Sequence, residues 1–93
     1  MAERRNGMTI EDWRAKIDAL DRRLAELLRE RAECVIAIGK IKNARKMEVF
    51  DPEREQQIIR NILQQNHGPL DDDALRRIFE RVIDECRRIE NNK

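Results

Sequence analysis

The sequence has no tyrosine, one tryptophan and two phenylalanines, so aromatic residues make up only 3% of its 93 positions. Glycine and proline are also scarce, with three and two copies. β-Sandwiches and barrels need aromatic and β-branched strands joined by many Gly- and Pro-containing turns, so these shortages argue against both. Charged residues, in contrast, make up 42% of the chain, which is typical of long helices exposed to water. The composition therefore predicts an all-α protein.

Cysteine and histidine are equally rare, and their positions exclude several kinds of site. Neither Cys34 nor Cys86 lies in a C-x-x-C or Cys/His spacing, and the single histidine, His67, borders a Gly-Pro turn. Both cysteines fall at apolar positions, where a free thiol usually behaves as a small hydrophobic group. We therefore expect no metal, no cofactor and no covalent catalysis.

The sequence also lacks an excess of one charge and a long apolar run. Twenty basic and 19 acidic residues leave a formal charge of +1, which offers no general attraction for nucleic acid or an anionic membrane. No apolar segment is long enough to span a bilayer, and no signal peptide is recognisable. We therefore expect a cytoplasmic protein with neither a nucleic-acid partner nor a membrane partner.

The N-terminal half predicts one long helix. Residues 1–8 are polar and without periodicity, so we expect a disordered tail followed by a single domain over residues 9–93. Thr9 and Asp12 have the spacing of a capping box. Apolar residues then recur at helical spacing as far as about Ala44, over roughly 50 Å of helix. They are Ile10, Trp13, Ile17, Leu20, Leu24, Leu27, Cys34, Ile38 and Ile41.

Two shorter helices should follow. Asp51-Pro52-Glu53 is a typical helix start, and this second helix should end before His67-Gly68-Pro69. Asp71 or Asp72 can cap the third helix, which has an apolar stripe. The stripe consists of Leu75, Ile78, Phe79, Val82, Ile83, Cys86 and Ile89. Two short helices cannot cover the whole apolar face of the long one, so we expect a second protomer to do so.

Arg31 interrupts the apolar face of the long helix where an aliphatic residue is expected. A buried guanidinium needs an anionic partner, because burying an unpaired charge costs several kcal/mol. Lys42 lies about three turns further along the same face, so the two cations could bind a small dicarboxylate between them. Alternatively, both side chains extend to solvent or pair with glutamates of neighbouring helices. Glu90 also leans toward the apolar stripe, although an acid so near the C-terminus could simply be solvated.

Four segments resemble the all-helical chorismate mutases over about residues 10–90. Arg14 lies in W-R-A-K-I-D-A-L-D, Arg31 in L-L-R-E-R and Lys42 at the end of G-K-I-K, and D-P-E-R-E covers residues 51–55. The order and spacing of these segments, followed by a third helix of suitable length, make the resemblance specific. It implies an intertwined homodimer of three-helix chains with two shared active sites.

The resemblance also implies roles for individual residues. Arg31, Lys42 and Arg54 would line the substrate pocket, and Arg14 would reach it from the other protomer. Asp51 and Glu55 match positions near the ring hydroxyl of the substrate. Cys86 and Glu90 also match pocket positions, and there the sequence departs from the family, which more often has Ser and Gln.

The implied reaction is the rearrangement of chorismate to prephenate in aromatic amino-acid biosynthesis, which needs no cofactor. The arginines would bind the substrate carboxylates and restrain its conformation. Lys42 and Glu90 would stabilise the negative charge that develops on the ether oxygen, and Glu90 would have to be protonated to donate a hydrogen bond. Two alternatives remain: an isochorismate pyruvate lyase of the same fold, and a helical dimerisation module without activity, which leaves Arg31 unexplained.

Overall fold

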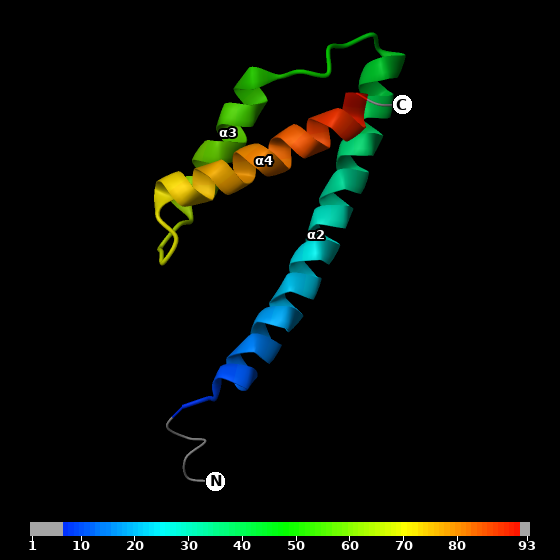
Figure 1. Cartoon of the computed structure of the whole chain (residues 1–93). Helices are drawn as coiled ribbons and strands as arrows, with labels where there is room; N and C mark the ends of the chain where they lie inside the picture. The colour runs from blue at the N-terminus through cyan, green and yellow to red at the C-terminus, as the bar shows by residue number, and fades with distance from the viewer. Residues whose placement is uncertain (1–6, 92–93) are drawn as a thin grey trace. The chain divides into compact units, whose positions relative to one another are not determined.

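Within residues 7–91, the chain forms three α-helices (Figure 1). The computed structural model describes residues 7–91; most of the predicted N-terminal tail, residues 1–6, lies outside this range. Helix α2 covers Ile10–Ala44, α3 covers Pro52–Gln64 and α4 covers Asp72–Asn91. Residues 7–91 contain no β-strand. The all-α fold with one long and two shorter helices is confirmed.

Each helix begins at a side-chain cap. The Asp12 amide donates to Thr9 Oγ1 and the Thr9 amide donates to Asp12 Oδ2, both at 3.1 Å, which is the expected capping box. Asp51 caps α3 by accepting from the Arg54 amide at 3.1 Å, with Pro52 as the first helical residue. For α4, Asp71 rather than Asp72 is the cap, because its Oδ1 accepts from the Ala74 amide at 2.8 Å.

The connection between α3 and α4 differs in one detail from the sequence-based expectation. Helix α3 ends at Gln64, and Gly68, expected as the helix stop, follows four residues later with a φ of 77°. Asn66 organises this turn instead. Its Nδ2 donates to the Leu70 carbonyl at 2.9 Å and to Asp72 Oδ1 at 2.8 Å, and its Oδ1 accepts from the Gly68 amide at 3.2 Å.

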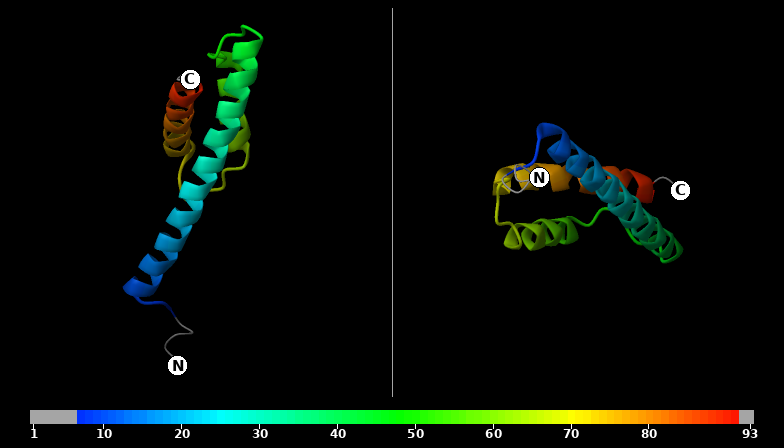
Figure 2. Two further views of the ribbon diagram at one scale, coloured as in Figure 1. Left: turned by 90° about the vertical axis from the view of Figure 1, so that its right-hand side faces the viewer. Right: turned by 90° about the horizontal axis from the view of Figure 1, so that it is seen from below.

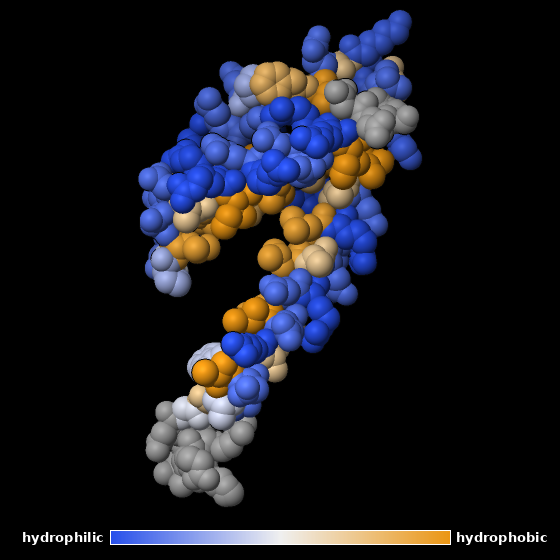
Figure 3. Space-filling view, viewed as in Figure 1, coloured by the Kyte–Doolittle hydropathy of each residue, from blue (hydrophilic) through white to orange (hydrophobic). Residues whose placement is uncertain are grey.

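The chain divides into two compact units, residues 1–31 and residues 32–93. In the first unit, Leu28 of α2 is 39% exposed, and six other large apolar side chains of this helix are between 49% and 65% exposed (Figure 3). They are Ile10, Trp13, Ile17, Leu20, Leu24 and Leu27. A row of exposed apolar side chains of this length is typical of a surface that another protein chain covers.

The second unit contains the end of α2 together with α3 and α4. Helices α3 and α4 pack side by side (Figures 1 and 2). Their contact buries little: among the described residues, Ile83 and Cys86 are the only buried apolar side chains of the core, and they are still 7% and 8% exposed. A core of this size is small for a stable domain, so we expect the chain to associate with another protein chain.

None of the helices in residues 7–91 combines the length and the apolar character that crossing a membrane requires.

Candidate active site

The C-terminal end of α2 turns the chain back toward Lys42. The Met47 amide donates to the Lys42 carbonyl at 2.8 Å and the Lys46 amide to the Asn43 carbonyl at 3.2 Å. This is the Schellman pattern, with Lys46 in the left-handed region at a φ of 59° in place of the usual glycine. The returning loop places the Val49 carbonyl 2.9 Å from Lys42 Nζ, which donates to it.

Lys42 Nζ also lies 3.0 Å from Glu90 Oε2, near the end of α4. The two side chains are only 16% and 11% exposed, so both charges are largely removed from water. Glu90 Oε2 is buried and has no hydrogen-bond partner among the described residues, because the ammonium approaches it outside hydrogen-bond geometry. The contact is therefore an ion pair that leaves this oxygen free to take part in a further hydrogen bond.

Gly39 makes the approach of α4 to this end of α2 possible. It is a buried residue of α2, and a Cβ atom there would lie 3.0 Å from both Glu90 Cγ and the Glu90 carbonyl oxygen. A larger residue would push the end of α4 away from Lys42. Helical periodicity alone did not predict this contact. A lone glycine within an amphipathic helix was the available signal for a close packing contact.

The three predicted site residues at the start of α3 have different surroundings. The Asp51 carboxylate is used as the helix cap, and Arg54 Nη1 donates to Gln57 Oε1 at 2.7 Å. Asp51 and Arg54 line a hollow of about 550 Å³ on the exposed side of α3. Glu55 instead faces α4, where Arg87 holds its carboxylate with both Nε and Nη2, at distances of 2.7–3.1 Å.

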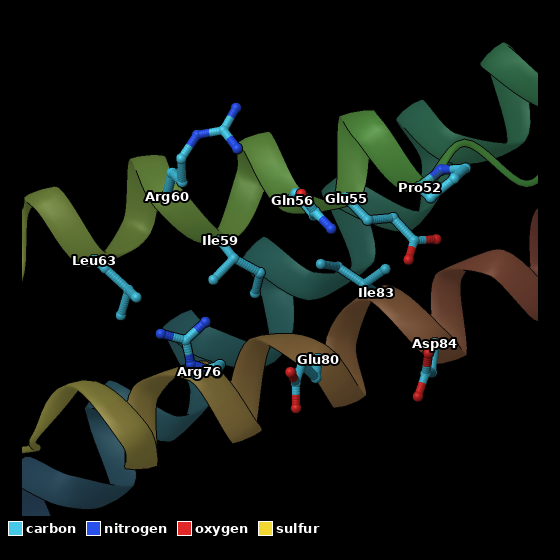
Figure 4. A pocket seen from close by; sticks show the side chains of 10 residues that line it. All are labelled: Pro52, Glu55, Gln56, Ile59, Arg60, Leu63, Arg76, Glu80, Ile83 and Asp84. Atoms are coloured by element: carbon cyan, nitrogen blue, oxygen red, sulfur yellow. The ribbon is translucent and has the colours of Figure 1, made fainter.

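A groove of about 460 Å³ runs between α3 and α4 (Figure 4). Ile59 and Ile83 lie between the two helices, and Glu55 extends from α3 toward α4 at one end. Arg60 and Arg76 also line the groove. Neither this groove nor the hollow at Arg54 includes Lys42 or Glu90.

The remaining predicted residues lie on α2 and α4. Arg14 is exposed and Arg31 is half-buried in the first unit, and they stand seventeen residues apart, about 25 Å along a helix. One chain therefore cannot bring these two arginines to the same small substrate. Cys86 is buried at 8% exposure and Cys34 is exposed, both as free thiols. Within residues 7–91, no three His, Cys, Asp or Glu side chains gather in a way that could hold a metal ion.

Comparison with known proteins gives consistent results. The sequence model of the family "Chorismate mutase type II" matches residues 13–91. The bifunctional chorismate mutase/prephenate dehydratase of Pseudomonas aeruginosa is 35% identical over 82 residues, which is 83% of this chain. That of Neisseria gonorrhoeae is 40% identical over 77 residues, again 83% of this chain. The chain spans only 22% and 21% of the length of these two relatives.

Solved structures match over most of their own length. A chorismate mutase from Thermus thermophilus superimposes with a TM-score of 0.88 at 26% identity, covering 90% of this chain and 96% of that one. A chorismate mutase from Helicobacter pylori, solved in complex with prephenate, gives 0.82 at 32% identity and covers 89% and 90%. With a family match over residues 13–91 and the same three-helix fold, the chain belongs to the type II chorismate mutase family.

Proposed function

We propose that this chain converts chorismate to prephenate, a step of aromatic amino-acid biosynthesis, in a pocket that includes Lys42 and Glu90. One observation carries most of the proposal. In a member of this family, an ammonium group is held by a backbone carbonyl and a carboxylate at a largely desolvated position. A cation fixed in such a place is suited to stabilising charge that appears during a reaction.

The reaction requires little covalent chemistry from the protein. A carbon–oxygen bond breaks while a carbon–carbon bond forms within one molecule, and no proton has to move. Catalysis then comes from holding the enolpyruvyl side chain over the ring and from stabilising the transition state more than the substrate. We assign the first task to Arg14, Arg31 and Arg54, which would bind the two carboxylates.

Lys42 takes the second task. The ether oxygen of the substrate gains negative charge as its bond stretches, and an ammonium that is already oriented stabilises it without reorganising. The Val49 carbonyl, which accepts from Lys42 Nζ at 2.9 Å, keeps this group from rotating freely. Glu90 would donate a second hydrogen bond to the same oxygen when it carries a proton. Cys86, buried one turn before Glu90, would form part of the apolar wall of the pocket.

The proposed active unit is a homodimer with two shared sites. The exposed apolar face of the N-terminal part of α2 and the small core of the second unit both favour association. Arg14 would complete the site of the opposite protomer. The expected cytoplasmic location and the expected absence of nucleic-acid and membrane partners remain predictions.

The test is to incubate the purified chain with chorismate and, separately, with isochorismate, and to identify the products. We expect prephenate from chorismate. Lys42→Ala should reduce turnover by about a hundredfold or more, as loss of a preorganised donor does. Lys40→Ala, at an exposed position of the same helix, is the matched control and should remain active.

Pyruvate release from isochorismate alone would instead identify a lyase. An inert protein would favour a dimerisation module. Equal turnover by the Lys42 and Lys40 variants would exclude Lys42 from the chemistry.

A further inference from the structure

Arg87 makes the strongest polar contact between α3 and α4. Its guanidinium donates through Nε to Glu55 Oε2 at 3.1 Å and through Nη2 to both carboxylate oxygens at 2.9 and 2.7 Å. The guanidinium carbon also lies 4.8 Å from the centre of the Phe50 ring. Arg87 therefore connects α4, the first turn of α3 and the loop before it.

This ion pair differs from the exposed ion pairs that Glu85 forms within α4. Arg81 and Arg88 pair with Glu85 of the same helix, and their side chains are 72% and 73% exposed. Solvent-exposed ion pairs within one helix contribute little to stability and do not hold either side chain in a fixed orientation. Arg87 and Glu55 belong to different helices and are only 35% and 26% exposed. Their contact is bidentate, which fixes the direction of the carboxylate as well as its position.

The pairing of Glu55 with Arg87 affects how well the pocket can bind an anionic substrate. Chorismate carries two carboxylates, and an uncompensated Glu55 carboxylate at the pocket would repel it. With Arg87 in place, the Glu55 carboxylate is paired with a base, whose Nη2 also lies 3.4 Å from Oδ1 of the exposed Asp84. The arginines at positions 31 and 54 can then give the pocket its excess positive charge.

We propose that Arg87 is a positioning residue for substrate binding: it orients the Glu55 carboxylate and cancels its charge, so that the pocket accepts a dianion. This inference rests on the function proposed above and on the expected place of Glu55 near the ring hydroxyl. Arg87 itself does not contact the substrate.

Arg87→Gln removes the charge and keeps a polar side chain. The matched control is Arg88→Gln, which changes the net charge equally at the next, exposed position. We expect Arg87→Gln to raise the KM for chorismate about tenfold, corresponding to one uncompensated charge near the substrate, with a smaller change in kcat. Arg88→Gln should leave both constants within about twofold of wild type, as expected for an exposed charge pair.

A double variant separates charge compensation from simple packing. Glu55→Gln/Arg87→Gln also lacks the link between α3 and α4, but the only acid it leaves without Arg87 is the exposed Asp84, whose Oδ1 lies 3.4 Å from Arg87 Nη2. We expect its KM to lie well below that of Arg87→Gln without reaching the wild-type value, because the Glu55 substitution also changes a group placed near the ring hydroxyl. If the effect of Arg87 were only structural, the double variant would be as impaired as the single one, and that result would overturn the proposal.

Two further outcomes are distinguishable. Wild-type protein that does not convert chorismate would overturn the proposed function and this inference with it. An active wild type with an unchanged KM in Arg87→Gln would overturn the inference alone.

If circular dichroism shows that Arg87→Gln does not fold, Arg87→Lys replaces it. This variant keeps the charge but loses the bidentate geometry, and its KM should rise only slightly. A KM rise as large as the tenfold change expected for charge removal would contradict charge compensation.

Discussion

At the residue scale, Lys42 Nζ faces the Glu90 carboxyl group at 3.0 Å. A substrate ether oxygen that accepts a hydrogen bond from this ammonium would lie close to the Glu90 carboxyl group. A carboxylate there would repel the ether oxygen. Glu90→Gln replaces the carboxyl group with an amide that can donate a hydrogen bond to the ether oxygen. We therefore expect Glu90→Gln to keep or raise kcat/KM. A large loss of kcat/KM in a folded Glu90→Gln protein would contradict the role given to Glu90.

At the scale of helices, the contact between Gly39 and Glu90 holds the ends of α2 and α4 together. Gly39→Ala should gain about 1 kcal/mol of helix propensity. Its Cβ, however, would lie 3.0 Å from two atoms of Glu90, and overpacking of this kind costs about 1–3 kcal/mol. We expect α4 to shift and turnover to fall about tenfold or more, since small displacements of catalytic groups have large effects.

Lys40→Ala is again the control for this prediction, because it raises helix propensity at an exposed position of α2 that makes no such contact. Turnover and thermal unfolding by circular dichroism should be measured for both variants. A Gly39→Ala protein as active as wild type would show that the position of Glu90 does not depend on this close approach.

At the scale of the whole molecule, the proposed shared sites make activity a property of two chains. Arg14→Ala and Arg31→Ala should each be nearly inactive yet remain helical and dimeric, because each loses a cation that binds substrate. If the two variants are mixed and allowed to exchange subunits, half of the dimers are mixed. Each mixed dimer then has one site with both arginines, so activity should recover to about a quarter of wild type.

This recovery would not occur if each chain supplied Arg14 to its own site. Analytical ultracentrifugation of wild type and both variants is the necessary companion measurement. A monomeric wild type would contradict the proposed assembly directly, whatever its activity.

Local rules were enough to predict the secondary structure. The capping box at Thr9, the Asp-Pro start at residue 51 and the acid cap before residue 72 depend only on neighbouring residues, and the structure confirms all three. Helical periodicity likewise predicted the extent of the long helix to Ala44. These signals lie within a few residues of one another, so they can be read without knowing the tertiary fold.

The tertiary structure alone decided which side chains meet. Glu55 pairs with Arg87 across 32 residues, and Lys42 pairs with Glu90 because Gly39 lets two helices approach closely. The sequence identified Lys42, Glu55 and Glu90 as candidates through their resemblance to a family, yet it contained no sign of Arg87 as a partner. Charged residues are so frequent in this chain that helical spacing cannot tell which acid neutralises which base, and only the packing of the helices selects the pairs.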